Sequence, residues 1–152
     1  MATKLANAQT DRPALSLSRQ VFEITKSVRF EAAHFMSSSP EGHPYRNIHG
    51  HSFCLEATIA GCLDEDQDWV EDFSVFTDKL NEVAKMLDHK LLNEIDGLGV
   101  PSLERLCVWV ANQLVVDFEG LQSVVISRPS LDERCKLVIP SVAHSGERPL
   151  QD

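Results

Sequence analysis

The segment HGHSFCLEATI occupies residues 49–59, and apolar and more polar side chains alternate along it from Phe53 onward. Successive side chains of a β-strand point to opposite faces, so a period of two predicts a strand with one apolar face. His49 and His51 begin that same face. Gly50 separates them and would let a neighbouring backbone segment lie close. The segment therefore predicts a strand whose apolar face starts with two imidazoles.

The preceding residues, 21–34, alternate in the same way, with Lys26 as the one polar break. The shared face of this second predicted strand carries Phe22, Ile24, Val28, Phe30, Ala32 and His34. A lone histidine at a strand end is usually an ordinary surface residue. Three neutral imidazoles with one open coordination position, however, are the ligand set of a catalytic zinc ion. The pattern thus favours a metal site formed by His34, His49 and His51.

Composition limits the class of protein. A chain of 152 residues suits one domain with a genuine core. The net charge of −9, without a run of Lys and Arg, argues against nucleic acid as a partner. The chain lacks a run of 18 apolar residues and an apolar segment near its start, so we expect neither a membrane span nor a secretory signal. The four scattered cysteines fit reduced thiols and a cytoplasmic location.

Two helices are predicted after these strands. Asp72 can cap the first helix, which we expect to end near Asp88 and His89. Its apolar stripe is Phe73, Phe76, Leu80, Val83, Ala84 and Leu87. Ser102 can cap the second helix, with Glu104 in the first turn, where a carboxylate interacts favourably with the helix dipole. The second apolar stripe is Leu103, Leu106, Cys107, Val110 and Leu114, so we expect the thiol in the core.

Two further strands are predicted at residues 121–126 and 134–139. The element order is therefore ββααββ, an α+β domain covering residues 21–140. The segments before and after it, residues 1–20 and 141–152, are polar and aperiodic. We expect them to be a mobile N-terminal tail and a C-terminal tail.

Several motifs resemble those of the 6-pyruvoyl-tetrahydropterin synthase family, and within it the bacterial 6-carboxytetrahydropterin synthases of queuosine biosynthesis. They are FEAAH (30–34), PEGH (40–43), HGHSF (49–53), WVEDF (69–73), LDH (87–89), LN (92–93) and PSLE (101–104). The resemblance implies the tunnelling fold, an antiparallel four-stranded sheet with two helices on one face. It also implies subunits that form trimeric barrels, two of which stack into a homohexamer with active sites between subunits.

The resemblance further implies residue roles. Zinc would be held by His34, His49 and His51 and would polarise the side chain of a pterin substrate, normally 7,8-dihydroneopterin triphosphate. Asp88 and His89 correspond to the pair that assists proton transfer. Histidine suits that role because it is tunable near neutral pH, and a nearby carboxylate orients it and stabilises its cation. Without the resemblance, the same pair would be interpreted as a favourable histidine at a helix C-terminus.

One departure from the family pattern is Tyr45. The family usually has a cysteine four residues before the first histidine of HisGlyHis, and it acts as acid or base on the pterin side chain. Cys54 does not substitute, because its odd parity against His49 and His51 places it on the opposite face. Tyrosine side chains have a reference pKa of about 10, against about 8.5 for cysteine. A tyrosine can therefore donate a proton, but it is a poor base unless a cation lowers its pKa.

The second departure is Arg128, which stands where the family has a glutamate that anchors the pterin ring. A carboxylate accepts from the pterin amino and ring N–H groups, whereas arginine is a donor only. Asp132 or Glu133 would have to replace the lost carboxylate from the next turn. Otherwise, Arg128 favours an anionic ligand, or is a surface arginine without a role.

Three hypotheses follow from the sequence. The first is a zinc-dependent lyase acting on a pterin, of the 6-carboxytetrahydropterin synthase type. The second is a diverged zinc enzyme of the same fold acting on another, anionic small molecule, which the changes at Tyr45 and Arg128 favour. The third is a non-catalytic metal-bound binding protein, which the presence of Asp88 and His89 disfavours.

Overall fold

The computed structural model describes residues 15–17 and 20–140, so both predicted tails lie almost wholly outside the described residues. The main elements are β1 (Phe22–His34), β2 (His49–Gly61), α1 (Phe73–Leu87), α2 (Leu103–Leu114), β3 (Leu121–Arg128) and β4 (Glu133–Val138). The predicted order ββααββ is confirmed, and the boundaries differ from the predicted ones by at most two residues. None of the described helices is long and apolar enough to cross a membrane.

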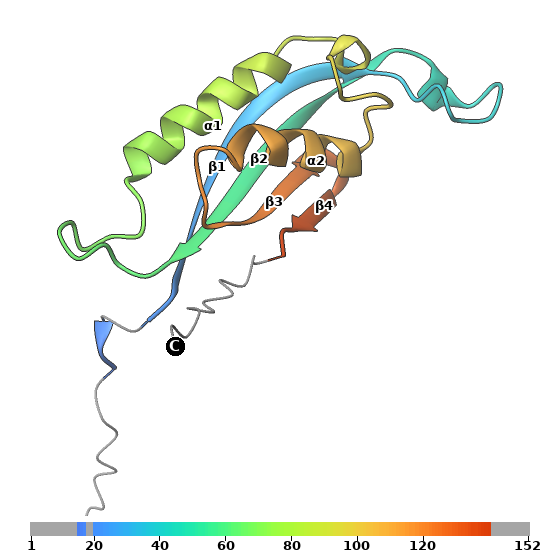
Figure 1. The fold of residues 1–152 in the computed structure, drawn as a ribbon. Coiled ribbons are helices and arrows are strands. Elements are labelled where there is room, and N and C mark those ends of the chain that lie inside the picture. The colour runs from blue at the N-terminus through green and yellow to red at the C-terminus, as the bar shows by residue number, and fades with distance from the viewer. Residues whose placement is uncertain (1–14, 18–19, 141–152) are drawn as a thin grey trace, which may run out of the picture.

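The four strands form one antiparallel sheet in the order β1-β2-β3-β4, and both helices cover the same face (Figure 1). The helix-facing side of the sheet is the apolar face predicted from the alternation. Phe30 and Phe53 are register partners there, and their stacked rings have centroids 5.0 Å apart. The opposite face carries polar pairs such as Glu31 and Ser52. Register therefore decides which polar groups meet on each side.

Helix α1 begins as predicted, because the Asp72 carboxylate accepts a hydrogen bond of 2.6 Å from the Ser74 amide. It buries Phe76, Leu80, Val83, Ala84 and Leu87 against the sheet. The prediction that Phe73 belongs to this apolar stripe is wrong. The side chain of Phe73, the first residue of the helix, is 51% exposed.

Helix α2 begins at its predicted cap, where the Ser102 hydroxyl accepts from the Arg105 amide at 3.3 Å. Cys107 is 1% exposed and packs in the core, as expected from its place in the apolar stripe. Its thiol donates to the Cys135 carbonyl of β4, with 3.4 Å between sulfur and oxygen. Burial raises the pKa of this thiol to about 12, so Cys107 stays protonated.

The chain that leaves α1 is fastened to the free edge of β1. Leu91 forms a parallel bridge with Ala33, and the His89 amide donates to the Glu31 carbonyl at 2.6 Å. Beyond them, the Asn93 side chain both accepts from the amide and donates to the carbonyl of one residue, Phe35. These contacts fix the segment after α1 against the end of β1 that carries the first histidine of the cluster.

Candidate functional site

The three histidines of the sequence pattern lie together at one end of the sheet. His34 on β1 and His49 on β2 are register partners, and their ring centroids are 4.6 Å apart. His51 follows two residues later on the same face, with its centroid 5.1 Å from that of His34. One nitrogen from each ring can be chosen so that all three lie within 4.8 Å of one another. Strand pairing alone therefore brings three candidate ligands together.

His34 is the buried member of the cluster, with 2% of its surface exposed. Its Nδ1 lies 3.1 Å from the Pro101 carbonyl oxygen, which can only accept, so Nδ1 carries the proton and donates. The Nε2 atom then presents a lone pair that has no partner among the described residues. Burial lowers the pKa of His34 to about 4, because its effect is larger than that of the hydrogen bond to the Pro101 carbonyl, which raises the pKa. His34 is thus a neutral imidazole with an unused, buried lone pair.

The other two histidines complete the donor set. His49 Nδ1 donates to the Asn47 carbonyl at 2.8 Å, which leaves its Nε2 free to coordinate. His51 Nε2 accepts from the Arg128 guanidinium at 3.4 Å, and burial, followed by the charge of Arg128, lowers the pKa of His51. Metal-bound histidines typically donate their second N–H to a carbonyl or carboxylate, as His34 and His49 do. The residues present fit a zinc-like divalent cation.

Tyr45 is brought beside the cluster by the loop between β1 and β2. It lies in the short 3-10 turn Pro44–Arg46, and its ring stacks on His49 with a centroid distance of 5.6 Å. The His43 ring packs edge-on against the Tyr45 ring, with 4.8 Å between their centroids. The Tyr45 carbonyl accepts from the Met36 amide at 2.7 Å, which closes the loop. The tyrosine is half exposed, so its hydroxyl can meet a ligand from solvent.

A pocket of about 230 Å³ adjoins the cluster, and Arg128 is one of the residues that line it. Its lining is His34, Met36, Tyr45, His49, Pro101, Ser102, Leu103, Glu104 and Arg128. The sequence reasoning missed Glu104, to which it gave only a role at the helix start. The Glu104 carboxylate is hydrogen-bonded first to its own backbone amide and then to the Ser102 side chain. Both hydrogen bonds hold the pKa of Glu104 below its ordinary value. An ionised carboxylate therefore borders the pocket. The PSLE motif, which ends in Glu104, was the feature of the sequence that could have pointed to this residue.

Arg128 does not lie free on the surface. It is the direct register partner of Glu133, and its Nη2 lies 2.5 Å from a carboxylate oxygen of that residue. The Arg128 side chain is 18% exposed. Asp132 adopts a left-handed backbone conformation with φ of 54° at the end of the turn Pro129–Leu131. Neither acidic residue appears in the lining of the 230 Å³ pocket.

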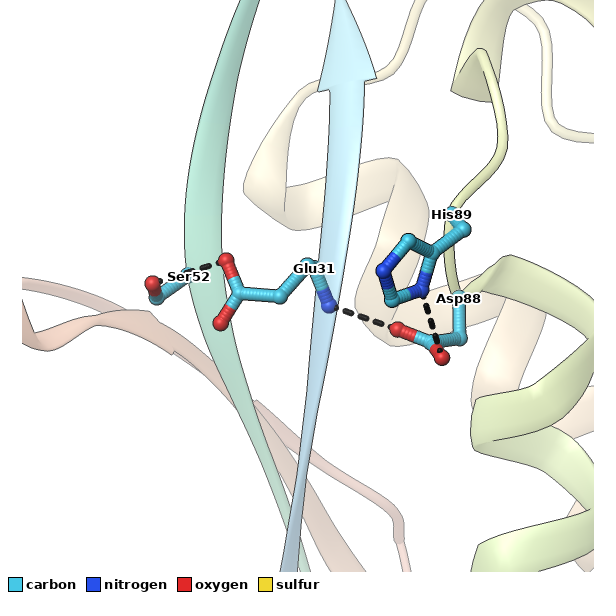
Figure 2. A network of polar contacts seen from close by, with 4 residues as sticks. All are labelled: Glu31, Ser52, Asp88 and His89. Atoms are coloured by element: carbon cyan, nitrogen blue, oxygen red, sulfur yellow. Dashed lines mark hydrogen bonds and ion pairs between the residues drawn. The ribbon is translucent and has the colours of Figure 1, made fainter.

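A second polar network joins the end of α1 to β1 and β2 (Figure 2). His89 Nδ1 lies 2.9 Å from one oxygen of Asp88, while the other oxygen accepts from the Glu31 amide at 2.8 Å. Ser52 in turn donates to the Glu31 carboxylate at 2.8 Å. The Glu31 amide, and then the His89 hydrogen bond, lower the pKa of Asp88, so its carboxylate stays ionised. Sequence reasoning found Asp88 and His89 but missed Glu31 and Ser52.

This network borders a second, open groove of about 610 Å³. Its lining is Glu31, Ala32, Ala33, Gly50, His51, Ser52, His89, Lys90, Leu91 and Ser130. His89 adopts a left-handed φ of 55°, a costly conformation that often occurs where a side chain is held for function. A Cβ on Gly50 would lie 3.5 Å from the Ala32 carbonyl, an ordinary contact. The expectation that Gly50 serves close backbone approach is therefore wrong; it leaves the groove open instead.

The structure thus divides the predicted site residues into two sets. Tyr45 and Arg128 adjoin the 230 Å³ pocket, whereas His89 borders the open groove. Within residues 20–140, no hydrogen bond, ion pair or ring contact joins His89 to Tyr45. The histidine cluster lies between the two sets, because His34 and His49 line the pocket while His51 lines the groove.

Comparisons with known proteins agree with this architecture. The sequence pattern described as 6-pyruvoyl tetrahydropterin synthase matches residues 23–138. A 6-carboxy-5,6,7,8-tetrahydropterin synthase of Synechocystis is 35% identical over 109 residues, covering 68% of this chain and 83% of the relative. A dihydroneopterin monophosphate aldolase of Pyrococcus furiosus is 30% identical over 104 residues, covering 68% of this chain and 82% of the relative.

Solved structures resemble the fold as well. A Caenorhabditis elegans 6-pyruvoyl tetrahydropterin synthase superposes with a TM-score of 0.70 at 17% identity, covering 80% of this chain and 97% of that one. A Plasmodium vivax 6-pyruvoyl tetrahydropterin synthase gives a TM-score of 0.63 at 20% identity, covering 78% of this chain and 97% of that one. At these identities the likeness establishes the fold alone, which is the tunnelling fold. Together with the sequence match over residues 23–138, it shows that the chain belongs to the 6-pyruvoyl tetrahydropterin synthase family, a family of pterin-related synthases.

Proposed function

We propose that this protein is a zinc-dependent lyase of the 6-carboxytetrahydropterin synthase type, with 7,8-dihydroneopterin triphosphate as its substrate, in a queuosine-type pathway. The observation that carries the proposal is the histidine cluster, in which the buried Nε2 of His34 has no partner in the part of the chain that the structure describes. A relative with the corresponding name, 35% identical to this chain, supports the substrate class.

The metal would be held by His34, His49 and His51. A zinc ion there would supply Lewis acidity toward an oxygen of the substrate side chain. The protein prepares this position by fixing the protons of His34 and His49 on Nδ1 through backbone carbonyls, which turns both Nε2 lone pairs toward the site.

His89 and Asp88 are the proposed proton-transfer pair. Since His89 Nδ1 is bonded to Asp88, His89 Nε2 is the nitrogen that can take a proton from the substrate. Asp88 fixes the ring and stabilises the imidazolium that forms. The Glu31 amide supports this role, because it stabilises the ionised form of Asp88. Tyr45 is the proposed proton donor on the other side, in place of the usual cysteine.

The separation of these two sets favours a site completed between subunits. His89 borders the open groove and Tyr45 borders the pocket, and both cavities open to solvent in the single chain. A neighbouring copy that covers the groove would enclose the reacting atoms and exclude water. We therefore include a homohexamer, a dimer of trimers, in the proposal.

Pterin recognition needs an acceptor for the amino and ring N–H groups. Arg128 is a donor only, and its ion pair with Glu133 engages the carboxylate that would have to replace the missing one. We propose Glu104 as the acceptor, because it is ionised and lines the pocket beside the cluster. Arg128, held by Glu133, would then contact an anionic part of the substrate.

The second candidate is a diverged enzyme of the same fold that acts on another anionic small molecule. The position of Arg128 in the pocket favours it, because a guanidinium there suits a carboxylate or phosphate. A non-catalytic metal-bound protein is a third candidate, and the ordered Asp88–His89 pair argues for an enzyme instead.

The test is incubation of the zinc-loaded protein with 7,8-dihydroneopterin triphosphate, followed by product identification by mass spectrometry. We expect a tetrahydropterin that carries a carboxyl group, and no such product with the His49→Ala variant. Turnover of a different anionic compound in a substrate screen, with the pterin untouched, would favour the diverged enzyme. Zinc binding without turnover of any compound in the screen would favour the binding protein.

A further inference from the structure

Arg128 occupies a position that bears directly on metal binding. Its Nη1 lies 3.4 Å from His51 Nε2, and its Nη2 lies 2.5 Å from a Glu133 carboxylate oxygen. The side chain is 18% exposed, and its buried Nε has no partner within residues 20–140. The guanidinium therefore contacts both the Glu133 carboxylate and His51, one of the three candidate metal ligands.

The hydrogen bond between Arg128 and His51 is chemically incompatible with a metal on His51. Arginine only donates, so His51 Nε2 must offer a lone pair to it. If the metal uses Nε2, that lone pair is no longer available to the arginine. If the metal uses Nδ1, the neutral imidazole carries its proton on Nε2, and two donors would face each other. Either choice breaks the observed contact.

Charge acts in the same direction. Arg128 is a fixed cation beside a site that would hold a divalent cation, and the two repel each other strongly in a partly buried environment. Glu133 offsets part of this repulsion, since its carboxylate pairs with the guanidinium. The balance between the two residues should therefore be visible in metal affinity.

We propose that Arg128 is a positioning residue that competes with the metal for His51, and that Glu133 restrains it, so that this ion pair sets the metal affinity of the histidine cluster. The inference rests on the metal site of the proposed function but not on its substrate. When metal binds, Arg128 releases His51 and its freed N–H group turns to other acceptors. Metal loading and the position of the guanidinium are thus coupled.

The test is zinc affinity of the purified full-length protein, stripped of metal and titrated in competition with a chromophoric chelator. We expect Arg128→Gln to bind zinc about tenfold more tightly or better, the scale on which groups around metal ligands act. Glu133→Gln should bind zinc more weakly, and the double variant should bind more tightly than Glu133→Gln. Arg134→Gln is the matched control, because it removes the same charge from an exposed neighbouring position on β4.

Nuclear magnetic resonance of the histidine rings gives a second readout that a merely structural role would not move. Zinc should shift the His51 Nε2 signal in the wild type, and Arg128→Gln without metal should already lack the hydrogen-bonded signal. Equal zinc affinities for wild type, Arg128→Gln and Arg134→Gln would overturn the competition while leaving the metal site intact. Failure of all variants to bind zinc would overturn the metal site itself, and with it both proposals.

Discussion

His34 and His49 face each other as register partners across the antiparallel pair β1 and β2, with ring centroids 4.6 Å apart. Their distance is set by sheet pairing, and His51 joins them because side chains of one strand repeat on the same face every two residues. The candidate ligands are therefore held together by backbone hydrogen bonds rather than by the ion. A single substitution in the cluster should remove a ligand without unfolding the sheet.

The first prediction concerns metal content. We expect the purified protein to bind about one zinc per subunit and the His49→Ala variant to lose it, because three imidazoles make the site. Elemental analysis measures this. His89→Ala is the matched control, since it removes an imidazole outside the cluster and should keep its zinc. Zinc at the wild-type level in His49→Ala would contradict the ligand assignment.

The second prediction separates Asp88 from the metal. An asparagine at this position can still accept from the Glu31 amide, so the loop should stay in place. It cannot stabilise a protonated His89, and we expect kcat on the pterin substrate to fall by about 100-fold or more. Zinc content and thermal stability should stay near wild type. Asp78→Asn, the same change at another site on α1, should leave kcat unaltered. An unaltered kcat in Asp88→Asn would remove the proposed role of the pair.

The third prediction concerns the stability of the fold at high pH. The pKa of the Cys107 thiol is raised from 9.0 to about 12 by burial, so the folded protein keeps this proton after the unfolded chain has lost it. The free energy of unfolding should therefore fall as pH rises above about 9, by up to about 1.4 kcal/mol per pH unit from this group. Guanidinium unfolding under reducing conditions between about pH 8 and 10.5, which brackets the reference thiol pKa, measures this fall.

The Cys107→Ala variant provides the comparison, since it lacks the titrating thiol. It should be less stable at neutral pH, because it leaves a small cavity in the core. Its stability should nevertheless decline less steeply with pH than that of the wild type. If the free energy of unfolding falls equally steeply with pH in both proteins, burial of Cys107 does not cause the loss of stability at high pH.

Local patterns identified the secondary structure well, because both helices and the two long strands are amphipathic over many residues. Phe73 shows the limit of such patterns. Its spacing fits the apolar stripe of α1, yet its position in the first turn leaves it half exposed. Helical periodicity gives the direction of a side chain, but not whether another element lies in that direction.

Contacts within the candidate site were predictable where the alternation along each strand showed which face carries a histidine, as for His34, His49 and His51. The facing of His49 and His51 follows from strand parity alone. The Ser52–Glu31 hydrogen bond depends on the register between two strands, and the Arg128–Glu133 ion pair depends on the turn between β3 and β4. Neither can be deduced from one segment, because sequence spacing does not give the pairing of distant strands.

The fourth prediction concerns assembly. β4 is an edge strand of the described sheet, and its last residue, Val138, is 65% exposed. At the other edge, the described part of the chain pairs with β1 at Ala33, through Leu91, and at Glu31, whose carbonyl accepts from the His89 amide. Unpaired edges favour association, and closure into a barrel between subunits removes them. We expect a trimer-based oligomer, most simply a hexamer, by static light scattering. A stable monomer at micromolar concentration would refute this.

The fifth prediction concerns Tyr45 and Arg128, the two departures from the family pattern, both of which line the pocket beside the histidines. If the chemistry has diverged, the wild type should turn over 7,8-dihydroneopterin triphosphate very slowly. The double variant Tyr45→Cys with Arg128→Glu should then gain activity, because it restores the usual acid or base and the carboxylate that anchors the pterin. Arg134→Gln again serves as a control for the loss of one positive charge.

The alternative outcome is equally informative about Tyr45. A wild type that already turns over the pterin at an ordinary enzymatic rate, about 1 per second or more, would refute divergence. Tyr45→Phe then becomes the decisive variant, because it keeps the ring that stacks on His49 and removes only the hydroxyl. A fall in kcat of about 100-fold with unchanged zinc content would identify that hydroxyl as the proton donor. An unchanged kcat would leave the Tyr45 ring with packing against His49 as its only role, and the proton donor would have to be sought elsewhere.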